Sequence, residues 1–222
     1  GPGLIRLASS EKAGGPYIAL SHCWGIEQSF ITTTHTLAQH EDKIEISQMP
    51  KTFQDAIWVT QQLNIRWLWI DSLCIIQDDE NDWQHESANM DHIYSNSYLT
   101  ISAAMASDDT VGCFSNRRTS QRVTRTFNEG RISCEVFVRP ELNHALFTRW
   151  ASDSERKKNP VFARGWCLQE WILSPRILHY AYEEMMWECL STMCCECSGV
   201  GRRSQPTPKY IYNRKDPSSS ED

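Results

Sequence analysis

Short apolar runs alternate with amphipathic stretches through the first hundred residues of the chain. Residues 17–20, 67–70 and 98–101 have the length and composition of buried strands. Between these runs, hydrophobic side chains recur at helical spacing over residues 53–63 and 83–94. This alternation predicts an α/β fold, in which a mostly parallel sheet of about four or five strands carries helices on both faces. We expect the second strand beside the first, and the third on the first strand's other side.

Polar residues mark where the predicted helices begin. Thr52 and Asp55 form a variant of the capping box, which indicates a helix start. The acidic run 78–82 suits the N-terminus of the second helix, because carboxylates complement the helix dipole. That run lacks the spacing and the glycine of an EF-hand loop, so we interpret it as a helix start rather than a metal site. Residues 26–50 have weak periodicity and predict a loop with a short helix.

The second half of the chain departs from this alternation. Residues 104–162 are polar and predict an insertion that is partly β, with a strand near residues 131–138. A helix is predicted over residues 166–173. Residues 177–182 and 185–189 then flank a polar turn and predict a hairpin.

The length suits one large domain with an insertion. The chain has 222 residues, of which 40% are hydrophobic, and this is enough for one substantial core. We assign residues 4–197 to that domain. Gly1-Pro2-Gly3 resembles the remnant that a tag-cleaving protease leaves, and it is excluded from the fold prediction. Residues 198–222 are polar and rich in Pro and Ser, which predicts a disordered tail or a linker to another domain of a longer protein.

Charge and hydropathy exclude some classes of partner. The net charge is −6 at pH 7 and the basic residues form only short pairs, which argues against nucleic acid as a ligand. No apolar run approaches the ~18 residues that a membrane span needs, and no signal-peptide pattern opens the chain. We therefore expect a cytoplasmic protein in a reducing compartment.

The cysteines divide into two groups. Cys23, Cys74 and Cys167 lie in apolar segments and are typical of small core residues. The second group consists of Cys189, Cys194, Cys195 and Cys197. It lacks two clean CxxC pairs, and the stretch 193–197 is also partly typical of a strand. The spacing favours free thiols over a zinc site, and both interpretations stay open.

Candidate ligand-binding residues follow the predicted strands and the later helix. Trp166 and Glu170 are one helical turn apart, which places an aromatic ring and a carboxylate on one face. That pair suits a flat ligand that is cationic or carries a sugar. Ligands of open parallel sheets bind beyond the carboxyl ends of the strands, at the switch point. We therefore predict that one cleft holds Ser21, His22, Asp71 and Glu170. In this interpretation Ser21 and His22 contact a ribose or phosphate, and Trp24 stacks on a base.

Each of these residues also has a structural interpretation. Glu170 also fits a solvated helix carboxylate or a buried partner of Arg164 or Arg176. His22 caps or braces the loop after the first strand, and Asp71 braces His22 or an arginine. Trp166 fits half-buried packing that lines the pocket better than a stacking platform. A Cys-His nucleophile pair of His22 with Cys74 or Cys23 is disfavoured, because apolar surroundings oppose a thiolate.

Three ordered blocks resemble the fungal heterokaryon incompatibility (HET) domain family. They are Tyr17-Ile-Ala-Leu-Ser-His-Cys-Trp-Gly25, Trp67-Leu-Trp-Ile-Asp-Ser-Leu-Cys-Ile-Ile-Gln-Asp-Asp79, and Arg164-Gly-Trp-Cys-Leu-Gln-Glu170. The resemblance covers about residues 17 to 190. It implies a cytosolic domain of a larger fungal protein, which triggers cell death on non-self recognition.

The run Trp166-Cys-Leu-Gln-Glu170 also resembles the Trp-Cys-Leu-x-Glu helix of TIR domains. That resemblance implies a flavodoxin-like sheet and a catalytic role for Glu170 in cleaving nicotinamide from NAD+ or NADP+, with no cofactor and no metal. The transition state of such a cleavage is oxocarbenium-like, as in glycoside hydrolysis. Self-association is expected to control the activity. The alternatives are a non-catalytic module that makes homotypic contacts, and a hydrolase that depends on cysteine.

Overall fold

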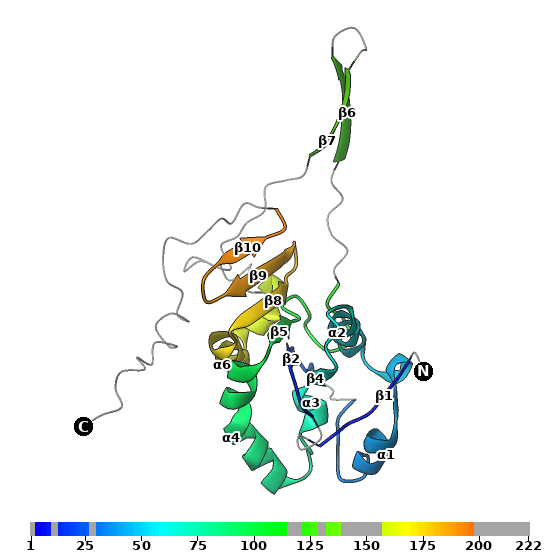
Figure 1. The fold of residues 1–222 in the computed structure, drawn as a ribbon, viewed down its shortest axis with the longest axis vertical. Helices are drawn as coiled ribbons and strands as arrows, with labels where there is room; N and C mark the ends of the chain where they lie inside the picture. The colour runs from blue at the N-terminus through cyan, green and yellow to red at the C-terminus, as the bar shows by residue number, and fades with distance from the viewer. Residues whose placement is uncertain are drawn as a thin grey trace, which may run out of the picture.

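A six-stranded sheet occupies the centre of the molecule, in a computed structural model that describes residues 3–9, 13–26, 30–114, 121–127, 132–138 and 157–197 (Figure 1). The strand order is β10-β9-β8-β5-β2-β4. In chain order, the strands are β2 (Tyr17–Ser21), β4 (Trp67–Trp69), β5 (Leu99–Ser102), β8 (Arg176–Tyr180), β9 (Met185–Cys189) and β10 (Met193–Cys195).

Four of these strands are parallel, and they form the part of the sheet that the hydrophobic runs predict. β2 pairs with β4 on one side and with β5 on the other, and β5 pairs with β8. The predicted neighbours of the first strand are therefore confirmed. β8 and β9 form the predicted hairpin. The sheet is larger than the expected four or five strands, because β10 pairs antiparallel with β9 and extends the edge.

Helices cover both faces of the sheet, as the alternation predicts. α2 (Lys51–Gln62) packs on one face, while α4 (Glu80–Asn96) and α6 (Gly165–Leu173) contact each other on the opposite face (Figure 1). Successive side chains of a strand point to opposite faces. Accordingly, Ile18 and Leu20 join the core cluster around α2, and Ala19 joins the cluster that contains Tyr94 and Leu173.

The helix starts agree with the sequence at α4 and differ from it at α2. Asp79 caps α4, because its side chain accepts hydrogen bonds from the backbone N–H groups of Asn81 and Asp82. The capping box predicted at α2 is wrong: Pro50 holds the N-cap position, and Thr52 lies inside the helix. Both predicted capping side chains instead accept from the backbone of a later loop, Thr52 from Gly112 at 3.1 Å and Asp55 from Cys113 at 2.9 Å.

Short elements complete the described chain. The predicted loop with a short helix contains α1 (Leu37–Asp42), β3 (Ile44–Glu45) and the 3-10 helix η2 (Ile46–Gln48), and β3 pairs with β1 (Leu4–Ile5). Residues 27–29 of that segment lie outside the described residues. Two further single turns lie near site residues: α3 (Asp71–Cys74), which begins with Asp71, and the 3-10 helix η4 (Pro160–Ala163), which precedes α6.

The insertion contains β structure, as predicted. β6 (Gln121–Phe127) and β7 (Ile132–Val138) pair antiparallel as a two-stranded sheet of their own. The sequence predicts β7 and does not predict β6, whose side chains are polar and basic at several positions. Residues 115–120, 128–131 and 139–156 of the insertion, and the predicted tail, residues 198–222, lie outside the described residues. None of the helices within the described ranges is both long and apolar enough to cross a membrane.

Candidate functional site

The candidate site lies at the carboxyl end of β2, beside the point where the sheet changes direction. The connection from β2 to β4 runs through α2 on one face, and the connection from β5 to β8 runs through α6 on the other. The strands β2 and β5 therefore border the switch point of the sheet. Their last residues, Ser21 and Ser102, lie directly opposite each other in the register, and both are buried.

Glu170 is a buried carboxylate next to Ser21. It lies on the sheet-facing side of α6 and is 4% exposed. Burial raises the pKa of Glu170 to about 7; the Ser21 hydroxyl lowers it by hydrogen bonding, and the charge of Asp71 raises it further. Its Oε2 atom has no hydrogen-bond partner among the described residues. A buried carboxylate with an unused acceptor and a pKa near neutrality is typical of a functional site.

The interpretation of Glu170 as the ion-pair partner of an arginine is not supported. No ion pair joins Glu170 to Arg164 or Arg176 in the described part of the chain, and the Nε of Arg176 donates instead to the carbonyl of Tyr98 at 2.7 Å. The positive charge of Arg164 lowers the pKa of Glu170 from a distance. Glu170 is also not solvated. The carboxylate is therefore buried, and it has no ion-pair partner among the residues that the structure describes.

His22 is a buried imidazole that the fold keeps neutral. Burial lowers its pKa, while the nearby charge of Asp71 raises it by less. The ring packs edge-on against Phe53, with ring centroids 5.1 Å apart. The Nδ1 atom lies 3.8 Å from Oδ1 of Asp71, which is longer than a hydrogen bond. The Nε2 atom has no partner among the described residues, so it is free to donate to or accept from a ligand.

Asp71 braces the loop that follows β2. It is the first residue of α3, and its carboxylate accepts hydrogen bonds from the indole Nε1 of Trp24 at 2.7 Å and from the backbone N–H of Ser72 at 2.8 Å. These contacts favour the bracing interpretation of Asp71 over a ligand role. The bond between Trp24 and Asp71 also fixes the Trp24 side chain and uses the only polar hydrogen of its indole ring. Stacking of Trp24 on a base stays a prediction.

Trp166 lies apart from the buried residues. It is 59% exposed, so the expectation of half-buried packing is wrong. The residues of α6 that face the sheet are Cys167, Glu170 and Leu173. Helix side chains lean toward the N-terminus, and a residue in the first turn therefore extends past the end of its own helix. The four-residue spacing places Trp166 and Glu170 one turn apart on the helix. The side chain of Trp166 is nevertheless exposed, whereas that of Glu170 is buried.

The structure brings Ser21, His22, Asp71 and Glu170 together, although they come from separate elements. Their group is closed rather than an open cleft, because Ser21, His22 and Glu170 are each at most 4% exposed. Tyr94 of α4 belongs to the same group, and sequence analysis placed it only at the end of the helical stretch 83–94. Its hydroxyl donates to the carbonyl of Leu20 at 3.1 Å and also lies beside Glu170.

The cysteines near the site are buried at Cys23 and Cys167 and partly buried at Cys74. Burial raises the pKa of Cys74 to about 12 and raises that of Cys23 as well. The Cys167 thiol donates to the carbonyl of His22 at 3.9 Å. Because a thiolate is the reactive form, these shifts oppose the hypothesis of a Cys-His nucleophile.

A second buried polar group lies beside Ser21, and sequence analysis missed it. The Nε2 of His179 on β8 lies 3.2 Å from Oε2 of Glu188 on β9, and the indole of Trp171 donates to the same oxygen at 2.7 Å. A small cavity lined by Ser21, Ser102, Trp171 and His179 separates the two groups. Only the antiparallel pairing of β8 and β9 places His179 near Glu188, so no local motif signals this group.

Comparison with known proteins gives one match. The family model described as Heterokaryon incompatibility protein (HET) matches residues 17–170. This span begins at the first residue of β2 and ends at Glu170. No curated protein and no solved structure matches the chain.

Proposed function

The chain belongs to the heterokaryon incompatibility (HET) family, and from this membership we propose that its part in incompatibility is enzymatic. The proposed reaction is hydrolysis of the bond between nicotinamide and ribose in NAD+ or NADP+. The observation that carries the proposal is the buried Glu170 carboxylate beside the carboxyl end of β2. Its Oε2 has no hydrogen-bond partner among the described residues, and its pKa is about 7.

The proposed chemistry needs few groups. Nicotinamide leaves as a neutral ring, so no general acid is needed, and the ribose passes through an oxocarbenium-like state. An ionised Glu170 beside that state stabilises its positive charge. Water then adds to the ribose carbon and releases a proton, which gives ADP-ribose or its 2′-phosphate. Ser21 and the free Nε2 of His22 are the polar groups that face the substrate's ribose or phosphate in this proposal.

The burial of the group supports control by a conformational change. A dinucleotide cannot reach side chains that are at most 4% exposed unless the surrounding elements move. We propose that the resting conformation is closed and that self-association favours an open one. A modest preference of the assembly for the open conformation is enough to shift the population, because the shift depends only on the difference in free energy between the two states.

The decisive experiment measures free nicotinamide after incubation of the purified protein with NAD+ and with NADP+. It compares the wild type, Glu170→Gln and the control Glu80→Gln, which changes an exposed carboxylate of α4. Each is assayed alone and fused to an oligomerising domain. Release by the clustered wild type and the control, but not by Glu170→Gln, supports the proposal. No release from any clustered form contradicts it.

A non-catalytic module that makes homotypic contacts is the second candidate. It is favoured by the exposed apolar side chains Trp166 and Leu168 at the start of α6, which are 59% and 50% exposed. Exposed aromatic and aliphatic side chains at one place are typical of protein contacts. This candidate predicts that Trp166→Ala abolishes self-association in sedimentation experiments while Glu170→Gln leaves cell-death signalling intact.

A further inference from the structure

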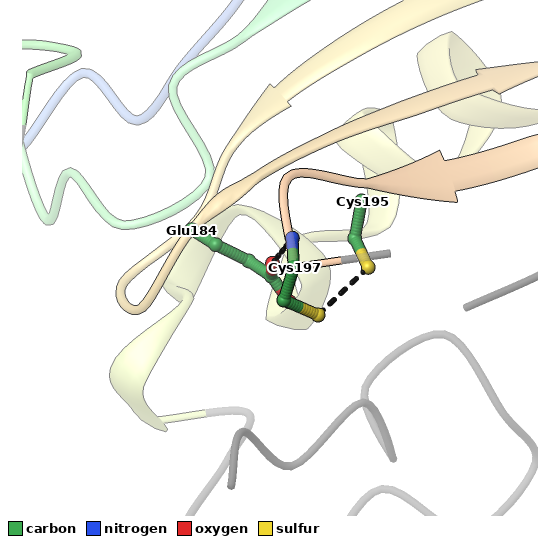
Figure 2. A group of neighbouring side chains, drawn as sticks. All are labelled: Glu184, Cys195 and Cys197. Carbon is green, nitrogen blue, oxygen red and sulfur yellow. Dashed lines mark hydrogen bonds between the residues drawn. The ribbon is translucent and has the colours of Figure 1, made fainter. Parts of the chain in front are cut away.

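Three side chains with metal-binding atoms converge at the antiparallel edge of the sheet. Figure 2 shows Glu184, Cys195 and Cys197 pointing toward one another, and their ligand atoms all lie within 4.8 Å of each other. Glu184 lies in the turn between β8 and β9, Cys195 ends β10, and Cys197 follows two residues later. This group is separate from the site around Glu170.

The sheet register produces the convergence. β10 pairs antiparallel with β9 so that Cys195 lies opposite Met186, two residues beyond Glu184. The end of β10 therefore lies beside the turn that carries the carboxylate. Glu184 then accepts a hydrogen bond from the backbone N–H of Cys197 at 3.0 Å, and its other oxygen lies 3.6 Å from the Cys197 sulfur. The two cysteine sulfurs are 3.0 Å apart (Figure 2).

The register also separates these two cysteines from the others nearby. Side chains alternate along a strand, so Cys194 points away from Cys195, and it is exposed. Cys189 lies at the far end of β9, opposite Arg176, with its sulfur 3.3 Å from the Ser191 hydroxyl. The sequence offers four cysteines in this region, and only the fold selects two of them and adds a carboxylate.

We propose that Glu184, Cys195 and Cys197 bind a zinc ion. Two thiolates and a carboxylate are ligands that zinc accepts, with Zn–S bonds of about 2.3 Å, and a fourth position remains for water or another side chain. Binding converts both thiols to thiolates and releases two protons.

The zinc ion joins the turn between β8 and β9 to the end of β10. β10 is an edge strand of three residues, and such a short strand gains little from its own pairing. A ligand that binds only the folded protein stabilises it in proportion to the logarithm of its concentration over its dissociation constant. We therefore expect the metal to raise the melting temperature of the 222-residue chain.

The test measures zinc in the purified 222-residue protein by inductively coupled plasma mass spectrometry, after exposure to zinc and removal of the excess. The wild type and Cys194→Ser should each retain about one zinc ion per chain. Cys195→Ser, Cys197→Ser and Glu184→Gln should lose most of it. Chelation should lower the melting temperature of the wild type and leave that of Cys195→Ser unchanged.

A second measurement keeps the test valid if the cysteine variants do not fold. Cobalt added to the wild type in place of zinc should give the intense near-ultraviolet absorption of cobalt–thiolate bonds, and Glu184→Gln should weaken cobalt binding. The proposal is overturned if the wild type retains no zinc and shows no such absorption. It is also overturned if the protein loses the mass of two hydrogens through a Cys195–Cys197 disulfide and binds no metal after reduction.

Discussion

The indole Nε1 of Trp24 donates a hydrogen bond of 2.7 Å to Oδ2 of Asp71, and this bond joins the loop after β2 to the first turn of α3. The sequence makes both residues candidates for ligand binding, whereas in the fold their side chains form a hydrogen bond with each other. The bond also holds the Asp71 carboxylate 3.8 Å from the imidazole of His22, whose pKa the Asp71 charge raises. Asp71 and Trp24 thus shape the candidate site by holding its loop.

We predict that Trp24→Phe lowers the stability of the protein. The change keeps the ring but leaves the partly buried Asp71 carboxylate without one donor, which costs about 1–3 kcal/mol. The control is Trp58→Phe, because Trp58 is 52% exposed and a phenyl ring can keep its edge-on contact with Phe114. Chemical denaturation of both variants checks the prediction. Equal midpoints for the two would show that the Trp24–Asp71 bond adds nothing.

Glu170→Gln should remove turnover while preserving dinucleotide affinity. The amide keeps the size of the side chain and removes the charge that the oxocarbenium-like state requires. Loss of one preorganised electrostatic group of this kind costs ~10²-fold or more in rate. Nicotinamide release and calorimetric titration with NAD+ measure the two quantities on the same samples. An equal loss in binding and turnover would assign Glu170 a binding role instead.

The difference in stability between Glu170→Gln and the wild type should depend on pH. The pKa of Glu170 is about 7 in the folded protein, against 4.5 for an unburied glutamate. The folded protein therefore holds this proton more tightly than the unfolded chain, and the wild type loses stability as pH rises from 4.5 through 7. The full loss is roughly 3 kcal/mol.

The amide in Glu170→Gln does not titrate in this range. The stability of the variant relative to the wild type should therefore increase between about pH 5 and pH 8. Buried His22 has a lowered pKa and destabilises the fold as pH falls below 6.5, but it does so in both proteins and cancels in the difference. Urea unfolding at several pH values measures the difference. A Glu170→Gln protein that is much less stable than the wild type at every pH would mark Glu170 as structural.

Gly25→Ala should destabilise the loop after β2. Gly25 has φ of +82°, and an added Cβ would lie 2.7 Å from the Cβ of Asp108. A left-handed backbone and a collision together cost more than about 1 kcal/mol. Gly14→Ala is the matched control, because its added Cβ meets no atom within 4 Å. Thermal melts of the two variants should separate clearly, and similar melting temperatures would contradict the described loop geometry.

Trp166→Ala should leave stability almost unchanged, within about 0.5 kcal/mol, because the side chain is 59% exposed. Trp171→Phe offers the contrast. Its indole donates to the fully buried Glu188 carboxylate at 2.7 Å, and removal of that donor should cost about 1–3 kcal/mol or more. Differential scanning calorimetry compares the two. A large loss for Trp166→Ala would show that Trp166 packs in the folded protein.

The parallel part of the sheet follows from local sequence because buried strands and amphipathic helices have different hydrophobic periods. Residues 17–20, 67–70 and 98–101 have the strand pattern, and each lies within or overlaps a strand of the sheet. The predicted neighbours of the first strand are also correct, since short crossovers allow few arrangements. The antiparallel extension was less predictable, because β10 is only three residues long.

Their positions after predicted strands and in motifs identified the candidate site residues in the sequence. The environments of these residues could not be predicted in the same way. Sequence spacing cannot show burial, so it did not reveal that Glu170 is closed off or that Trp166 is exposed. The bond between Trp24 and Asp71 spans 47 positions and exists only because β2 and β4 are neighbours. Such long-range contacts are absent from any local pattern.

The sequence by itself determined the alternation of strands and helices, the family blocks and the residue types at the end of β2. The tertiary structure alone decided which groups meet: Glu170 with Ser21, His179 with Glu188, and Glu184 with Cys195. The physical reason is that hydrophobic period is a property of neighbouring residues, whereas burial, pKa and ligand geometry depend on strand order and register, which bring distant residues within a few ångströms.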